Sequence, residues 1–192
     1  MIKTISLILI SLSLISCQST DHTVNTFQLS QGPKNSLVNF NSTQLMIQRI
    51  DLVDYLKQSN IMFELDNGEL IATKYQVWAE PISQGISRAL VNDINASQSA
   101  VRADSSSFSS CNPTMPCYKL ELFVEKFYPS ANSSVSFSGK YKLHLGNTLI
   151  EQRDFNLSKE LNQDGYPHAV VSLQALISEL GDLIIERISQ NS

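Results

Sequence analysis

The sequence has little positive charge and no basic run. Its 192 residues include 14 Lys and Arg against 18 Asp and Glu, for a formal net charge of -4. Proteins that bind nucleic acids carry a basic patch or stripe, so we expect no nucleic-acid partner. There is no low-complexity repeat or heptad array, and the 42% of apolar residues is too high for a disordered chain. The length suits a single domain.

The sequence signatures of enzymes are also missing. There is no phosphate-binding loop and no dinucleotide-binding fingerprint. The three histidines, His22, His144 and His168, have no spaced partner that suggests a metal site or a catalytic triad. Gly85–Ala89 superficially resembles the serine nucleophile elbow, which needs a sharp strand-to-helix turn, but Ser87 falls inside an amphipathic helical pattern. The sequence therefore predicts a protein that is not an enzyme, with no catalytic residue, metal ligand or cofactor.

The first 16 residues have the pattern of an export signal. Lys3 precedes an uncharged run of Ile, Leu and Ser that is too short for a confident transmembrane span of about 20 residues. A short basic start followed by a short apolar stretch is typical of a secretory signal peptide. The segment Leu14–Cys17, of sequence LISC, also resembles the bacterial lipobox, in which the peptide is cut before the cysteine and the cysteine is lipidated. The alternative is an ordinary signal peptide with an incidental cysteine.

The residue after this cysteine indicates the destination membrane. In enterobacterial lipoproteins an Asp at this position retains the protein in the inner membrane, and here the residue is Gln18. The sequence therefore resembles lipoproteins sorted to the outer membrane of a Gram-negative bacterium, on its periplasmic face. We expect a signal peptide over 1–16, a segment over 17–26 that holds a lipidated Cys17 (with acyl chains such as palmitate) and a polar tether, and a domain over 27–192.

The other two cysteines are close together in the sequence. Cys111 and Cys117 bracket a short Asn- and Pro-containing segment, and an exported chain meets an oxidising compartment, so a disulfide between them is expected. Closing so small a loop should stabilise the fold by roughly 2 kcal/mol. A zinc site would need the paired Cys and His clusters that are missing here. The spacing is also not that of a C-x-x-C redox motif.

The hydrophobic periodicity predicts one α/β domain. Alternating patterns predict strands, and apolar residues at helical spacing predict helices over 81–96, with Pro81 at its first position, and over 168–189. The expected strands begin at Phe27–Leu29 and continue at 45–53, 61–65, 69–75, 118–128, 134–145 and 148–157, with a short strand around 99–103. Gly32–Pro33 should break the first strand. We expect a mixed, largely antiparallel sheet packed by two main helices, one a crossover helix after Trp78 and one C-terminal. Because the first helix joins two strands without a hairpin, those two strands can be parallel neighbours.

One segment identifies a family. The sequence Trp78-Ala79-Glu80-Pro81-Ile82, at the end of a strand and the start of an amphipathic helix, resembles the hallmark of the ABC-type transport auxiliary lipoproteins, the PqiC/YmbA-like family. The lipobox, Phe27-x-Leu29 and the segment Leu52–Leu56, where the family has an "lP.YL" pattern, agree with it. The resemblance covers about residues 26–190. Val53 stands where the family commonly has Pro, and the pair of cysteines at 111 and 117 is not part of the family pattern.

The resemblance implies a role in transport. Members of this family sit beside an ABC permease, an ATPase and a membrane-anchored MCE-domain protein in systems linked to lipid movement between the two membranes. It implies that this protein binds the MCE protein, as an auxiliary subunit at the outer membrane, and by analogy with MCE rings that it forms a cyclic homo-oligomer. Trp78 could be an interface anchor, or it could pack in the core with Glu80 stabilising the helix N-terminus. The alternative function is a lipoprotein regulator of an envelope enzyme, such as a cell-wall synthase.

Overall fold

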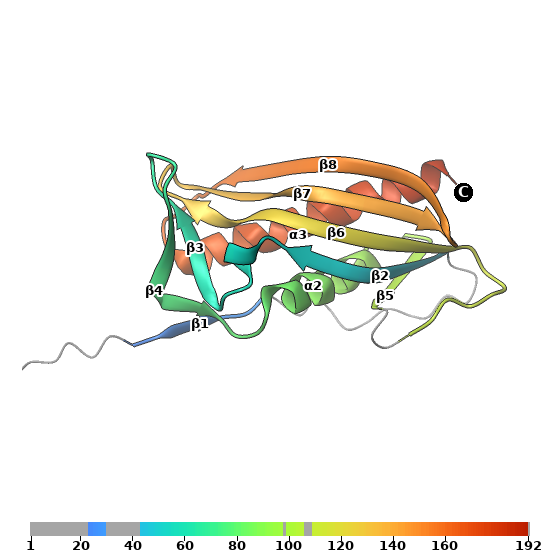
Figure 1. Ribbon diagram of the computed structural model, residues 1–192, viewed down its shortest axis with the longest axis horizontal. Helices are drawn as coiled ribbons and strands as arrows, with labels where there is room; N and C mark the ends of the chain where they lie inside the picture. Colours follow the sequence, from blue (N-terminus) through green and yellow to red (C-terminus); the bar gives the residue numbers. More distant parts are fainter. Residues whose placement is uncertain (1–22, 30–42, 98, 106–108, 192) are drawn as a thin grey trace, which may run out of the picture.

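The computed structural model shows a curved sheet with two helices on one face (Figure 1) and describes residues 23–29, 43–97, 99–105 and 109–191. The expected signal peptide 1–16, the expected lipidation at Cys17 and the expected break at Gly32–Pro33 lie outside the described residues. The strands of the described part are β1 (Asn25–Phe27), β2 (Thr43–Leu52), β3 (Asn60–Glu64), β4 (Leu70–Trp78), β5 (Val101–Ser105), β6 (Cys117–Ser130), β7 (Ser134–Leu145) and β8 (Thr148–Glu160). The helices are α2 (Ile82–Ala96) and α3 (Tyr166–Gln190), with a short 3-10 turn, η2 (Asp54–Leu56).

The sheet is mixed, with its longest pairings antiparallel. The strand order is β1-β4-β3-β6-β2-β5, and β7 pairs with β6 and carries β8 on its other side. The pairs β6–β7 and β7–β8 are antiparallel hairpins, whereas β2 runs parallel to both β5 and β6. Because β7 follows one edge of β6 throughout, β2 and β3 share the other edge end to end, with η2 between them. The expected α/β fold with a mixed, largely antiparallel sheet is confirmed.

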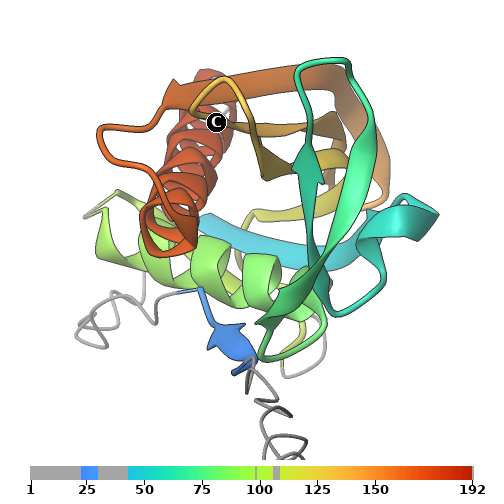
Figure 2. The ribbon, with the colours of Figure 1, turned by 90° about the vertical axis from the view of Figure 1, so that its left-hand side faces the viewer.

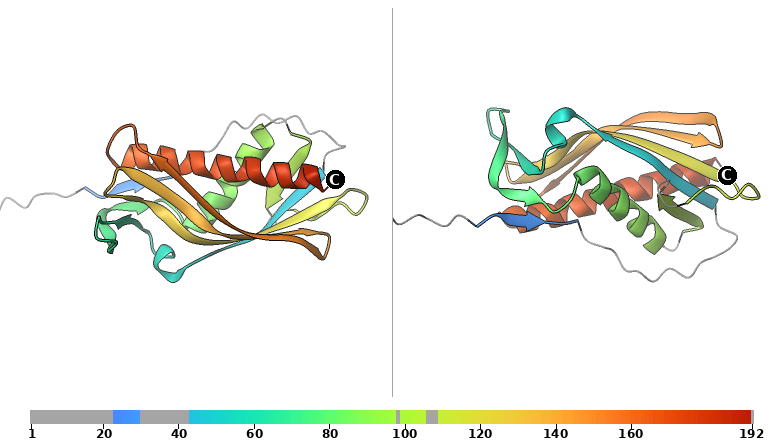
Figure 3. Two further views of the ribbon diagram at one scale, coloured as in Figure 1. Left: turned by 90° about the horizontal axis from the view of Figure 1, so that it is seen from above. Right: turned by 60° about the horizontal axis from the view of Figure 1, so that its bottom comes forward.

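The two helices fill the concave side of the sheet. Figure 2, which looks along the long axis, shows the strands curving around α2 and α3, and Figure 3 shows α3 lying along the strands. The helix α3 contacts β6, β7 and β8, while α2 contacts β2, β5 and α3. By length and composition α3 could cross a membrane, but its apolar stripe is fully buried against the sheet and α2, with Leu173, Ile177, Leu180 and Ile184 each 0% exposed. Core packing therefore explains its apolar character.

Several boundaries differ from the sequence expectation. The first strand begins at Asn25, so Asn25 and Thr26, expected in the tether, pair with β4 instead. The helix α2 begins at Ile82, with Pro81 as the residue before it. The helix α3 begins two residues earlier than expected, at Tyr166, because Pro167 fits its first turn, where a missing N–H costs nothing.

The crossover through α2 connects two strands that are not neighbours in the sheet. It leads from β4 to β5, and β5 pairs with β2 rather than with β4. Along the sheet, β3, β6 and β2 lie between the two strands that α2 connects. The parallel neighbour that the sequence allowed for β4 across this helix is therefore not formed. The expected short strand around 99–103 is present as β5.

Candidate functional site

The motif that identified the family connects β4 to α2. Trp78 is the last residue of β4 and is only 7% exposed, with its ring centroid 5.9 Å from that of Phe127 on β6. Phe127 in turn contacts Phe137 edge-to-face at 5.2 Å. Of the two roles considered for Trp78, the structure places its side chain in the core of the domain.

The backbone of the same motif holds the N-terminal strand. Phe27 of β1 lies opposite Trp78 in a parallel ladder, and the N–H of Ala79 donates to the carbonyl of Phe27 at 2.7 Å. Arg88 of α2 reaches back to the carbonyl of Leu29 at 3.3 Å, and Leu29 is 1% exposed. The segment that continues from the expected lipid tether is therefore fixed to the domain by the motif and the helix that follows it.

An ion pair stabilises this arrangement. Nη1 of Arg88 donates to Oε2 of Glu80 at 2.6 Å, and Nη2 of Arg88 lies at ion-pair distance, 2.5 Å, from Oε1. The side chains of Glu80 and Arg88 are 23% and 27% exposed, so water screens the ion pair only partly. The hydrogen bond from Arg88 lowers the pKa of Glu80 below its ordinary value. Helix α2 has no side-chain hydrogen bond that caps its N-terminus, and the carboxylate of Glu80 is held by Arg88.

Replacing Glu80 with glutamine is expected to destabilise the domain by about 1–3 kcal/mol at neutral pH, because Arg88 then loses its carboxylate partner in a partly buried place. Since the pKa of Glu80 is depressed in the folded state, the pair stabilises the fold above the unfolded-state pKa, and this contribution is lost as the pH falls through the folded-state pKa. Urea unfolding of wild type and Glu80→Gln across that pH range measures the effect, and the difference between them should shrink on acidification. The exposed Glu179→Gln variant is the control, and an equal loss at all pH values would contradict the assignment.

The "lP.YL" segment of the family forms a corner beside β6. Val53 has φ -59° and ψ 153°, the conformation that a proline at this position would have. Its N–H donates to the carbonyl of Val124 at 3.1 Å, a bond that proline could not make. The departure from the family pattern at Val53 therefore keeps the backbone shape and adds a hydrogen bond.

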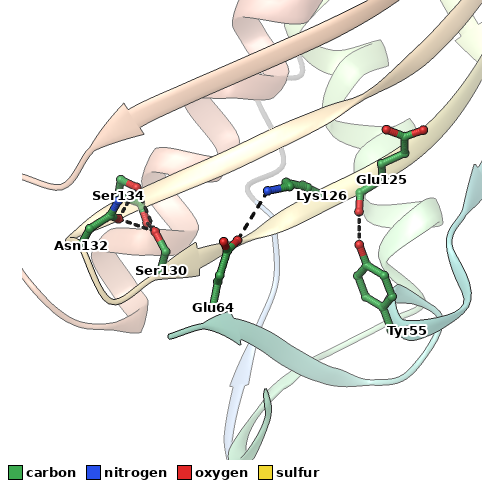
Figure 4. Close-up of polar contacts among 7 residues, drawn as sticks. All are labelled: Tyr55, Glu64, Glu125, Lys126, Ser130, Asn132 and Ser134. Carbon is green, nitrogen blue, oxygen red and sulfur yellow. Dashed lines mark hydrogen bonds and ion pairs between the residues drawn. The ribbon is translucent and has the colours of Figure 1, made fainter. Parts of the chain in front are cut away.

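Tyr55 in this corner bonds a bulge in β6. The pairing of β6 with β7 skips Glu125, between Val124 and Lys126, and such a bulge leaves the extra residue outside the ladder. The hydroxyl of Tyr55 donates to the carbonyl of Glu125 at 2.5 Å (Figure 4). Next to it, Lys126 lies 3.6 Å from Glu64 of β3 (Figure 4). These contacts attach η2 and β3 to β6 and shape a surface; they do not place a base against a nucleophile.

A buried tyrosine lies beneath this group. Tyr128 is 2% exposed, and burial raises its pKa well above the usual range, with Tyr55 and Glu64 as further causes. A hydroxyl with a raised pKa stays protonated and donates hydrogen bonds. Farther along the same strand, Ser130, Asn132 and Ser134 hydrogen-bond one another across the β6–β7 turn (Figure 4).

The three candidate catalytic side chains of the described part, Ser87, His144 and His168, belong to three different elements. Ser87 is inside helix α2 and not at a strand-to-helix turn. His168 is exposed in the first turn of α3, and His144 is in β7. Within the described ranges, no group of three His, Cys, Asp or Glu side chains is placed to hold a metal ion.

The opposite end of the molecule carries the disulfide. Cys111 and Cys117 are bonded, with their Cα atoms 5.9 Å apart. The N–H of Asn112 in this loop donates to the side chain of Gln44 at 2.7 Å, and the N–H of Gly146 in the β7–β8 turn donates to the carbonyl of Cys117 at 2.9 Å. The loop and the turn are thus joined at the end of the domain that lies away from β1 (Figure 1). We call the disulfide loop 109–117 and the turn 145–149 the distal surface.

Comparison with known proteins settles the family. The family model described as "ABC-type transport auxiliary lipoprotein component" matches residues 27–185. The chain belongs to this family. The prediction made from the Trp78 motif is therefore confirmed. No curated protein matches the chain at a significant level.

Solved structures share the fold. A crystal structure of an uncharacterized protein has a TM-score of 0.74 at 20% identity, covering 86% of this chain and 99% of its own. Protein XCC0632 from Xanthomonas campestris, a member of the DUF330 family, has a TM-score of 0.64 at 15% identity, covering 88% of this chain and 100% of its own. At these identities the likeness shows a common fold.

Proposed function

We propose that this protein is a periplasmic lipoprotein, anchored in the outer membrane through Cys17, and that it serves as the auxiliary subunit of an MCE/ABC-type intermembrane lipid transport system. It acts by binding protein partners and not by catalysis. Membership of the transport auxiliary lipoprotein family is the observation that carries the proposal. The geometry of the tethered strand and of the distal surface supports it.

The length of the tether determines which end of the domain is near the membrane. Eight Cα-to-Cα steps lead from Cys17 to Asn25, the first residue of β1, and they span at most about 28 Å when fully extended. The motif around Trp78 fixes β1 to the domain. The end that holds the start of β1, which we call the proximal end, therefore stays close to the membrane surface. Helix α3 begins at this end, and its 25 residues extend about 37 Å toward the other end of the domain.

The distal surface is suited to a protein partner. Leu145 and Leu149 are 38% and 48% exposed on either side of the β7–β8 turn, and apolar side chains are the usual centre of a binding patch. The disulfide beside them limits the motion of the neighbouring loop, which lowers the entropy lost on binding. In our proposal this surface receives the MCE-domain protein, with its ABC permease, as that protein crosses the periplasm.

Charging the distal surface is expected to abolish partner capture. In a pull-down from crosslinked envelopes, wild type should recover the MCE protein and its permease, and the double variant Leu145→Glu/Leu149→Glu should not, because two carboxylates would have to be desolvated in the interface. Val171→Glu, at a position 69% exposed near the proximal end, is the matched control and should bind as wild type does. Capture of a cell-wall synthase without any MCE protein would favour the alternative, a regulator of an envelope enzyme.

The second partner in the proposal is another copy of the chain. MCE proteins form rings with a central channel, and a cyclic homo-oligomer would offer a matching collar. A formal net charge of only -4 allows copies to associate without strong repulsion. Light scattering of the protein at micromolar concentration should give the mass of a closed ring, and a strict monomer that also ignores the MCE protein would contradict both partner assignments.

A further inference from the structure

The proximal end contains a cavity beside the β6–β7 turn. It has a volume of about 420 Å³, within the range of small-molecule sites. Three segments form it: the end of β3, the β6–β7 turn, and the loop from β8 into α3. Its apolar lining comes from Phe63, Pro129, Ala131, Leu161, Tyr166 and Ala169.

Main-chain hydrogen bonds fix these segments to one another. The N–H of Ala131 in the β6–β7 turn donates to the carbonyl of Glu64 in β3 at 2.8 Å. The N–H of Leu161, after β8, donates to the carbonyl of Ser133 in the same turn at 2.7 Å. The walls are therefore held without a ligand, which is the usual condition of a binding cavity.

The cavity lies next to the strand that continues from the tether. The ring of Tyr166, on its wall, is 6.4 Å from Phe27 of β1 and 6.3 Å from Phe63. Figure 2 faces this end of the molecule and shows β1, the β3–β4 hairpin and the start of α3 together. With at most about 28 Å of extended chain between Cys17 and β1, the anchor keeps the cavity within reach of the membrane surface.

The rim of the cavity is polar and carries negative charge. The hydroxyl of Ser133 donates to the carboxylate of Asp164 at 3.0 Å, and both residues line the cavity. A carboxylate at the rim repels the charged head of a free fatty acid. Hydroxyl groups and a carboxylate suit the glycerol and the cationic group of a zwitterionic phospholipid instead.

We infer that this cavity binds an acyl chain of a zwitterionic phospholipid from the leaflet that holds the anchor. The chain lies among Phe63, Leu161 and Tyr166, and the headgroup stays at the rim beside Asp164. The inference rests on the anchor proposed above and adds to it a contact between the auxiliary subunit and the lipid itself.

The test is photo-crosslinking of the full lipoprotein in cells. Phe63 is replaced by p-benzoylphenylalanine, whose benzophenone ring inserts into neighbouring C–H bonds, and the irradiated protein is weighed intact. We expect an added mass equal to a phospholipid. The same probe at Val171, exposed on α3 and outside the cavity, should give no adduct. Introducing Ala131→Phe at the exposed rim should remove the adduct at position 63 while the Cys111–Cys117 disulfide and protease resistance persist.

Other outcomes would overturn the inference. Equal adducts at 63 and 171 would show that the whole end lies in the bilayer, and an adduct unaffected by Ala131→Phe would place the lipid outside the cavity. If the folded protein gives no lipid adduct with the probe at position 63 or at position 161, no bilayer lipid enters the cavity. This outcome includes the case in which the protein's own acyl chain fills the cavity. An adduct at 63 in a protein that captures no MCE partner would leave the lipid site standing and contradict only the proposed function.

Discussion

The Cys17→Ser variant is expected to be absent from the outer membrane. Without the thiol the lipobox Leu14–Cys17 cannot be lipidated, so the protein should appear as uncleaved precursor or as soluble periplasmic protein. One acyl chain holds a protein to a bilayer only marginally, while several hold it stably, so removing all of them should give an all-or-none change. Membrane fractionation together with the intact mass of the purified protein measures both the location and the modification.

Two neighbouring substitutions make this test specific. Ser16→Ala keeps a small residue before the cysteine and should fractionate as wild type does. Gln18→Asp should keep the lipid and move the protein to the inner membrane, because sorting depends on that residue. If Cys17→Ser matches wild type in mass and fractionation, the anchor is wrong, and with it the assignment of a proximal and a distal end.

The sequence predicted strands and helices correctly where the hydrophobic pattern that defines an element lies entirely within that element. The alternation from Val135 to Leu145 predicted β7, and the apolar stripe of α3 gave its length to within a few residues. Both patterns follow from burial of one face, which the sequence records at every second residue in a strand and every third or fourth in a helix. The family resemblance was likewise carried by a contiguous segment, Trp78–Ile82.

The contacts that give this motif its role were not predictable in the same way. The parallel pairing of β1 with β4 joins segments about 50 residues apart. Arg88 is partly exposed on its helix, and its bond to Glu80 depends on how the chain enters α2 through Pro81. Hydrophobic periodicity does not report that entry angle. The available signal for this bond was that Glu80 and Arg88, which carry opposite charges, lie within one short segment of the sequence.

The bulge in β6 was also not predicted, although Lys126 stands where the alternation of the strand requires an apolar residue. The alternation predicted a strand from Tyr118 to Glu125, and the register shifts after Val124, so that Phe127 rather than Lys126 turns to the core. A register shift moves side chains to the other face of a sheet. The two residues that accommodate it, Tyr55 in the corner and Gly139 in β7, come from distant parts of the chain.

Replacing Gly139 with alanine is therefore expected to be among the most damaging single changes in the domain. Gly139 lies opposite Val124 at the edge of the bulge, and a Cβ added there would stand 2.0 Å from the carbonyl oxygen of Phe123 and 3.1 Å from its carbonyl carbon. Both atoms are backbone of a central strand, so no side chain can rotate away and the two long strands must separate. Overpacking of this kind costs about 3 kcal/mol or more, which lowers the melting temperature by roughly 6–12 °C in a domain of this size.

Gly68→Ala is the matched control, since Gly68 has φ +80° with nothing within 4 Å of an added Cβ. This substitution should cost only the roughly 1–2 kcal/mol of the left-handed conformation. Thermal and urea unfolding of both variants measure the difference, and a Gly139→Ala protein as stable as Gly68→Ala would show that β6 and β7 do not approach so closely at the bulge.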